Sequence, residues 1–196
     1  MVRRVPKTIL ALAIALTLAG AAAAEQRPTV AIMPAQYFQA DAQSAENVTL
    51  GLVERFEAER YSIIPMDRAR QTFQQMGFSP SRNISDAAIL QFGRRLGADL
   101  VAHPQLLAIR PWRSAGTAST GSRGARAVLY LRVLNVQTGQ PLYTRQIAYT
   151  FRGPASEAGP PVLSASGAAA AATEVSRPYF ERVAGSRQAL HRSAHQ

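Results

Sequence analysis

The pattern of apolar and polar residues divides the first half of the chain into short strands and amphipathic helices. Residues 29–34 are apolar and end at a proline, which predicts a buried strand that stops there. A polar loop is expected next, followed by a helix from Ser44 to about Glu59. Residues 61–65 predict a second short strand. The apolar residues of the helix recur at every fourth position, as one buried face requires: Val48, Leu52 and Phe56.

Two further helices are predicted next, each with a start and a stop signal. Asp67 and Ser85 are residue types that accept hydrogen bonds from the free N–H groups of a first helical turn. Gly77 and Gly97 follow the two apolar patterns, where a glycine ends a helix in the left-handed conformation. The chain then enters a third strand at residues 99–109.

Two long amphipathic strands follow, at residues 127–136 and 142–151. In each strand one face is apolar, so each is expected to be covered on one side. The face consists of Leu129, Leu131 and Val133 in the first strand and of Tyr143, Ile147, Tyr149 and Phe151 in the second, where Arg145 interrupts it. Gly139 and Pro141 lie between them, as is typical of a hairpin connection. The order β-α-β-α-α-β-β-β, with a closing helix as an option, predicts an α/β (α+β) fold. We expect a mixed β-sheet with packed helices that ends in an antiparallel hairpin, because β-α-β segments favour parallel neighbours.

The composition changes after residue 152, where Pro, Gly, Ser and Ala dominate. A last helix is expected beyond this stretch, kinked at Pro178 unless it begins near Ser176. The residues after it are polar and basic and predict disorder. The predicted division is a signal peptide at 1–24, an α/β domain at 25–152, a flexible linker at 153–167, a C-terminal helix at 168–185 and a disordered basic tail at 186–196.

The first 24 residues have the features of an export signal. Arg3, Arg4 and Lys7 precede an apolar run without charge, and three small residues end at Ala24, which predicts cleavage before Glu25. The run is shorter than the roughly 20 residues that span a bilayer as a helix. An uncleaved N-terminal anchor stays open as the alternative. The sequence therefore predicts a periplasmic or secreted bacterial protein.

Three segments together resemble a known family. They are TVAIMP at 29–34, ILQFGRRLGADLVAHPQLLAI at 89–109 and AVLYLRVLNVQTGQPLYTRQI at 127–147. They are similar to the α/β domain shared by the TolB amino-terminal region, the curli-secretion protein CsgG and the outer-membrane activators of peptidoglycan synthases. The resemblance spans about residues 28–151 and implies a soluble domain that docks other proteins.

Two positions depart from the family pattern. Asn135 stands where the family has aspartate, and His103 stands where it commonly has glycine. The chain also contains no cysteine, so attachment of a lipid to a cysteine does not carry over from the family.

Composition narrows the function classes. The chain has 196 residues, 47% of them hydrophobic and 17% charged, which excludes a wholly disordered protein and predicts one modest domain. Its formal net charge of +10 comes almost entirely from arginine, which binds carboxylates and phosphates in a bidentate fork. We expect an envelope protein or an anionic envelope polymer as partner, and the export signal argues against nucleic acid. A solvated basic surface is the plain alternative.

Candidate catalytic chemistry is sparse, and no catalytic residue, cofactor or metal site is predicted. His103 lies in a predicted strand beside Pro104. It can be interpreted as a structural histidine or as a catalytic one. His191 and His195 are four residues apart, but they lie in the basic tail without a nearby carboxylate. No glycine-rich phosphate loop with its Gly-Lys-Ser/Thr ending occurs.

A loop rich in Gly, Ser and Thr is predicted between Arg110 and Arg126, and it carries the best candidate binding residues. Tryptophan and arginine are the types that most often dominate protein interfaces. An ordinary mobile hairpin connection is the alternative. The predicted partner-binding residues are Arg110, Trp112, Arg113, Arg123 and Arg126.

Two functional interpretations follow. The first is an exported, non-enzymatic interaction or scaffold protein that works in envelope assembly or transport and binds through these arginines and an exposed strand edge. The second is a secreted hydrolase or transferase with an atypical site around His103.

Overall fold

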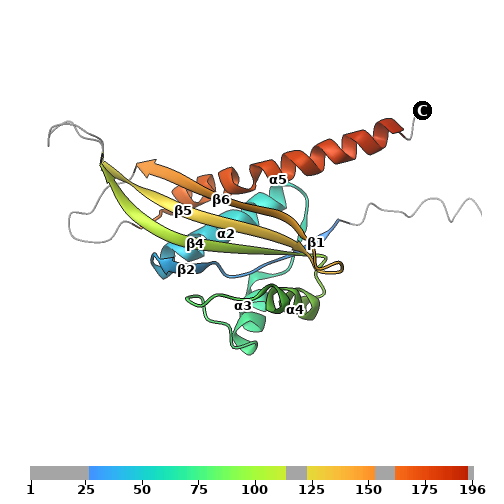
Figure 1. Ribbon diagram of the computed structural model, residues 1–196, viewed down its shortest axis with the longest axis horizontal. Coiled ribbons are helices and arrows are strands. Elements are labelled where there is room, and N and C mark those ends of the chain that lie inside the picture. The colour runs from blue at the N-terminus through green and yellow to red at the C-terminus, as the bar shows by residue number, and fades with distance from the viewer. Residues whose placement is uncertain (1–26, 114–122, 153–161, 194–196) are drawn as a thin grey trace, which may run out of the picture.

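The computed structural model describes residues 27–113, 123–152 and 162–193. Within them a mixed sheet of six strands packs against four helices, which confirms the predicted fold class (Figure 1). The predicted signal peptide and most of the predicted linker lie outside the described residues. The strands are β1 (Thr29–Ile32), β2 (Gln36–Gln39), β3 (Ser62–Ile63), β4 (Leu100–Arg113), β5 (Arg123–Asn135) and β6 (Pro141–Arg152). The helices are α2 (Ala42–Ala58), α3 (Met66–Gln75), α4 (Asp86–Leu96) and α5 (Ala165–Ser193).

The sheet is parallel at one side and antiparallel at the other. Its order is β3-β1-β4-β5-β6, with β1 parallel to both β3 and β4. The strands β4, β5 and β6 form a long antiparallel meander. Because β1 and β3 are joined through a helix while β4 to β6 follow one another directly, both pairings follow from the element order.

Strand β4 changes neighbour along its length. Residues 100–102 pair with β1, and residues 105–108 pair in parallel with β2. Pro104 lies in the gap between these two pairings. A proline cannot donate a hydrogen bond to a neighbouring strand, so it is tolerated here, where no strand pairs on that side.

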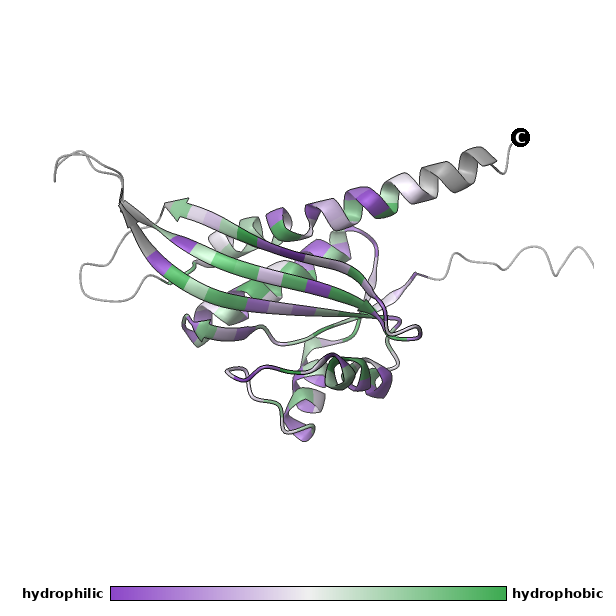
Figure 2. Cartoon of the chain, in the orientation of Figure 1, coloured by the Kyte–Doolittle hydropathy of each residue, from purple (hydrophilic) through white to green (hydrophobic). Residues whose placement is uncertain are grey.

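Two hydrophobic cores cover different parts of the sheet (Figures 1 and 2). The larger core lies between the sheet and the helices α2 and α5 and follows β5 along most of its length. The smaller core lies on the other face, beneath α3 and α4, and includes only Leu134 of β5. The distal parts of β4, β5 and β6 extend past α3 and α4, as Figure 1 shows. Alternate residues of β5 fill the larger core: Ala125, Ala127, Leu129, Leu131 and Val133.

Several predicted helix signals are confirmed, and two are wrong. The side chain of Ser85 accepts from the Ala88 N–H, and Gly97 ends α4 with a φ of 67°. The N-cap of α2 is Asp41, not Ser44, and its carboxylate accepts from the Ser44 N–H at 2.7 Å. Asp67 lies in the first turn of α3 but makes no capping hydrogen bond. The polar loop expected after residue 34 contains β2, so the predicted element order lacks one strand.

The last helix is longer than the predicted span of 168–185. It begins at Ala165 and continues through Pro178 to Ser193, so the structure places residues 186–193 in a helix and not in a tail. Its first half packs on α2 and the sheet, and its C-terminal part projects past the body (Figure 1). Among the described residues, no helix has the length and apolarity needed to cross a membrane.

Candidate binding surface

The predicted binding residues lie at the tip of the β4–β5 hairpin, on strands and not in a loop. Arg110 pairs with Arg126, and Arg113 pairs with Arg123, in the antiparallel register. Trp112 is opposite Gly124. The prediction of a loop from residue 110 to 126 is therefore wrong at both ends, because backbone pairing continues along both strands. The connection at 114–122 lies outside the described residues.

Arg110 and Arg126 place two positive charges side by side on the sheet. Both side chains are exposed, and directly opposite residues of antiparallel strands have Cβ atoms about 4.5–5.5 Å apart. Within the part of the chain that the structure describes, neither makes an ion pair with a carboxylate. Two like charges this close repel each other, so an anionic partner group would relieve the repulsion.

One face of the distal meander is not covered by a helix of the described chain. We call it the open face and define it by residues of β5 and β6 whose side chains point away from the larger core. Val128 and Tyr130 are half-buried there. The guanidinium of Arg132 lies 6.0 Å from the centre of the Tyr130 ring and pairs with the carboxylate of Asp86. On β6, the exposed residues opposite the outward-facing residues of β5 are Thr144, Gln146, Ala148 and Thr150.

The whole meander is positively charged. Between residues 100 and 156 the chain has seven arginines and not one aspartate or glutamate. Asp86, the carboxylate that pairs with Arg132, comes from α4 and not from the meander. The charge balance of this region is therefore much more basic than that of the helices, which carry both signs.

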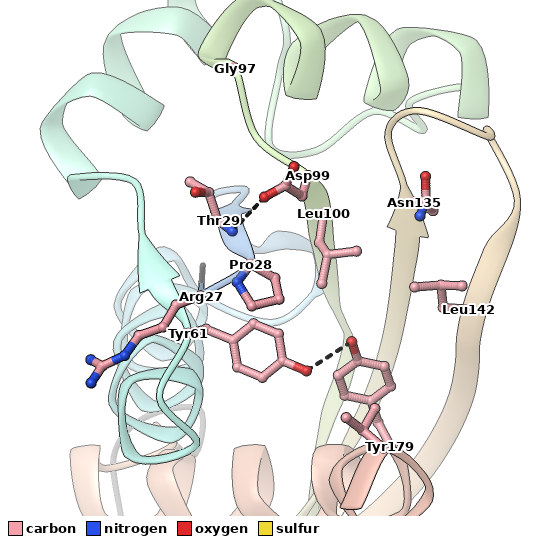
Figure 3. Close-up of a pocket in the computed structure, with 11 residues that line it drawn as sticks. Arg27, Pro28, Thr29, Tyr61, Gly97, Asp99, Leu100, Asn135, Leu142 and Tyr179 are labelled. Atoms are coloured by element: carbon pink, nitrogen blue, oxygen red, sulfur yellow. Dashed lines mark hydrogen bonds between the residues drawn. The ribbon is translucent and has the colours of Figure 1, made fainter. Parts of the chain in front are cut away.

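A pocket lies at the opposite end of the sheet, where β4 begins (Figure 3). It has a volume of about 670 Å³. The hydroxyls of Tyr61 and Tyr179 are 3.3 Å apart, and their rings point toward each other in Figure 3. The lining residues are Arg27, Pro28, Thr29, Tyr61, Gly97, Asp99, Leu100, Asn135, Leu142, Tyr179 and Val183.

Asp99 contributes a carboxylate to this pocket, and the hydrogen bonds that it makes to the backbone account for its position there. Its Oδ2 accepts from the Thr29 N–H at 2.8 Å, and its own N–H donates to the Thr29 carbonyl at 2.9 Å. The residue therefore joins the start of β1 to the start of β4. This is a structural role, and among the described residues that line the pocket there is no histidine and no second carboxylate.

His103 is fully buried on the sheet, beside the glutamine that begins β2. Its Nε2 lies 2.7 Å from the Gln36 side-chain oxygen, which also accepts from Gln105. Because that oxygen can only accept, Nε2 carries the proton, and Nδ1 is left without a hydrogen-bond partner among the described residues. Burial, and secondly the nearby charge of Arg132, lowers the pKa of His103 to about 3.

A neutral, inaccessible histidine is poorly suited to acid–base catalysis, since a substrate has to reach the group that moves the proton. His191 lies in α5, and His195 lies outside the described residues. In the described part of the chain, no group of three or more His, Cys, Asp or Glu residues is arranged to hold a metal ion.

Comparison with known proteins identifies the fold. No family model and no curated protein matches the chain. Among solved structures, lipoprotein GNA1162 from Neisseria meningitidis is similar over 67% of this chain and 88% of its own, with 12% identity and a TM-score of 0.50. The LpoB C-terminal domain from Salmonella enterica matches over 68% of this chain and 90% of its own, with 14% identity and a TM-score of 0.44. The PelC dodecamer from Paraburkholderia phytofirmans matches over 76% and 81%, with 12% identity and a TM-score of 0.44. The chain thus shares its fold with a bacterial lipoprotein.

The open face is the feature that sequence reasoning missed. The sequence pattern of residues 127–136 and 142–151 predicted one uncovered side for each of these two strands. It did not show that the uncovered sides of β5 and β6 lie next to each other and form one surface. The absence of acidic residues between 100 and 156 was the available signal, since it marks this meander as unlike the rest of the chain.

Proposed function

We propose that this protein is an exported, non-enzymatic binding protein of the bacterial cell envelope whose partner is another protein. The observation that carries the proposal is the open face of the meander, which lies beside the two adjacent arginines, Arg110 and Arg126, at the hairpin tip. A rigid sheet presents such a surface in one fixed shape, so little conformational freedom is lost on binding.

Export is part of the proposal and rests on the first 24 residues. Their charge and hydropathy pattern is that of a signal peptide. GNA1162, whose fold is similar, is a bacterial lipoprotein, which supports an envelope location. The resemblance of segments 29–34, 89–109 and 127–147 to the TolB and CsgG family supports the same assignment. Lipid attachment is left out of it because the chain has no cysteine.

A protein partner is favoured because the surface combines positive charge with aromatic, aliphatic and amide side chains. An anionic envelope polymer would need charge alone, whereas the open face also offers Tyr130, Val128 and three β-branched or amide side chains of β6. Aromatic and arginine side chains together are typical of protein interfaces. A hydrolase or transferase centred on His103 is disfavoured by the complete burial of that residue.

Site-specific photo-cross-linking in intact cells tests the proposal. A photoreactive residue at Thr150, on the open face, should give a discrete adduct with one envelope protein. The same residue at Leu50, which is 42% exposed on α2, is the matched control and should not. The Arg110→Ala, Arg126→Ala double variant should weaken the Thr150 adduct. A Thr150 variant that gives no protein adduct, or full-length chain found only in the cytosol with its first 24 residues intact, would contradict the proposal.

A further inference from the structure

The outer edge of β6 is a strand edge with which no strand of the described residues pairs. β6 is the last strand of the sheet order and pairs only with β5 in the described structure, from Pro141 opposite Leu134 to Arg152 opposite Gly124. In an antiparallel strand, the N–H and C=O groups of alternate residues point toward the neighbouring strand and away from it. About half of the backbone groups of β6 therefore face a side where no strand of the described chain lies.

The features that keep such an edge unpaired are confined to the first part of β6. Natural edge strands are protected by prolines, bulges, inward charges or short length. β6 begins with Pro141, has a bulge near Leu142, and carries one inward charge, Arg145, opposite the core residue Leu131. From Gln146 to Phe151 it has no proline, glycine, bulge or charge. These residues favour strands, with threonine, tyrosine and isoleucine among them. An edge of this length and composition is suited to adding a further strand.

The charges beside the edge indicate what kind of strand it would accept. Burial raises the pKa of the Tyr143 phenol, and Arg145 of β6 and Arg182 of α5, whose positive charges lie near that phenol, act against the rise. The Arg182 guanidinium also donates to the Leu142 carbonyl at 3.4 Å. A second copy of this chain would bring another acid-free meander with seven arginines to this edge. Like charges on adjacent strands are destabilising, whereas a carboxylate opposite Arg145 is stabilising.

We propose that the edge of β6 binds an extended acidic segment of a partner protein, which adds to the sheet as a further strand. The backbone of the segment pairs with β6 between Tyr143 and Phe151. Its carboxylates lie opposite Arg145 and near Arg182. Its intervening residues continue the open face beside Gln146 and Ala148, which are exposed on β6. This inference rests on the proposed function and adds the mode of binding and the chemistry of the bound segment.

The binding test uses the purified full chain and synthetic peptides about as long as β6. One peptide alternates glutamate with valine, and its matched control has lysine in place of glutamate. Heparin serves as an anionic polymer that cannot form a strand. The glutamate peptide should slow hydrogen exchange of the β6 amides about tenfold or more, because those amides become hydrogen-bonded. The lysine peptide and heparin should not.

Proline substitution tests whether the edge itself is used. Of the adjacent positions Ile147 and Ala148, one N–H faces β5 and the other faces outward. Because Ile147 packs on the larger core, each proline variant is compared with a threonine control at its own position, Ile147→Thr or Ala148→Thr. The proline variant that melts no lower than its control is the one that blocks the outward donor. It should bind the glutamate peptide at least about tenfold more weakly, since proline interrupts an added strand. Ala148→Thr keeps the N–H and should bind normally.

The outcomes separate this inference from the function on which it rests. Binding of the glutamate peptide without protection of β6, or full binding by the folded proline variant, would refute strand addition. Protection of β6 that rises with protein concentration in the absence of peptide would assign the edge to a second copy and refute the acidic segment. In either case, a protein adduct at Thr150 would leave the proposed function standing.

Discussion

The two ends of the sheet differ in how many of their faces are covered. At the end where β1, β3 and β4 begin, helices pack on both faces, with α2 and α5 on one and α3 and α4 on the other. At the other end, α2 and α5 are the only described helices that cover the distal meander, and they cover one face. The doubly covered end contains the smaller core and part of the larger one, and the singly covered end carries the two adjacent arginines. We therefore expect stability and recognition to be concentrated at different ends.

The largest expected effect comes from removing a side chain from the doubly covered end. Phe92 of α4 is fully buried in the smaller core. Phe92→Ala should lower the free energy of unfolding by about 3–5 kcal/mol, because it leaves a cavity in a packed core. Gln146→Ala, on the open face, should change it by less than about 0.5 kcal/mol. Urea denaturation measures the free energy of unfolding of both variants. Equal losses of free energy would contradict a difference in packing between the two ends of the sheet.

A matched pair of glycines tests the contact between α2 and α5 that supports the meander from behind. A Cβ added at Gly51 would lie 2.9 Å from the Ala169 Cα, whereas a Cβ at Gly185 meets nothing within 4 Å. Both changes to alanine raise helix propensity. Gly51→Ala should nevertheless be about 1–3 kcal/mol less stable than Gly185→Ala, because the two backbones must separate. Equal melting temperatures for the two variants would contradict this close approach.

His103 should make stability depend on pH. In the unfolded chain its pKa is near 6.5, and in the folded protein burial holds it at about 3, so between these values the unfolded state binds the extra proton. Stability is therefore retained above pH 6.5 and falls as the pH decreases, approaching about 1.4 kcal/mol per pH unit from this group. His103→Gln should remove that contribution. Parallel curves of unfolding free energy against pH for the two proteins would refute it.

The smallest effect on stability is expected at the hairpin tip. Arg110→Ala combined with Arg126→Ala should change the unfolding free energy by less than about 0.5 kcal/mol, with a slight gain at low salt because two like charges are separated. The same pair should weaken partner binding in the cross-linking experiment above. A large loss of stability would mean that these arginines serve the fold and not recognition.

Most of the helix ends and turns that the sequence predicted correctly depend on residues close together in the chain. Gly97 adopts the left-handed conformation that ends α4, and Ser85 caps its start, because both effects depend on residues within one helical turn. The hairpin at Gly139 follows from similar local rules. These signals require no knowledge of the rest of the chain.

The parts that could not be predicted depend on contacts between distant residues. Strand β2 contains two glutamines and has a polar pattern, and it forms because it pairs with β4 and buries Gln36 against His103. Which side of the meander stays uncovered likewise depends on how far α3 and α4 reach along the sheet. The five candidate binding residues were identified by type, and their role in binding stays a prediction.

The length of β4 fixes a distance across the molecule. Its 14 residues, at about 3.3 Å each, reach up to about 45 Å from the end that adjoins Arg27 to the hairpin tip. Arg27, the first residue described, lies at the end away from the tip. Any anchor joined to the chain ahead of Arg27 would thus hold the molecule at the end opposite the hairpin tip. The distance from that end to the arginines of the tip exceeds the thickness of the hydrocarbon core of a bilayer, which is about 30 Å.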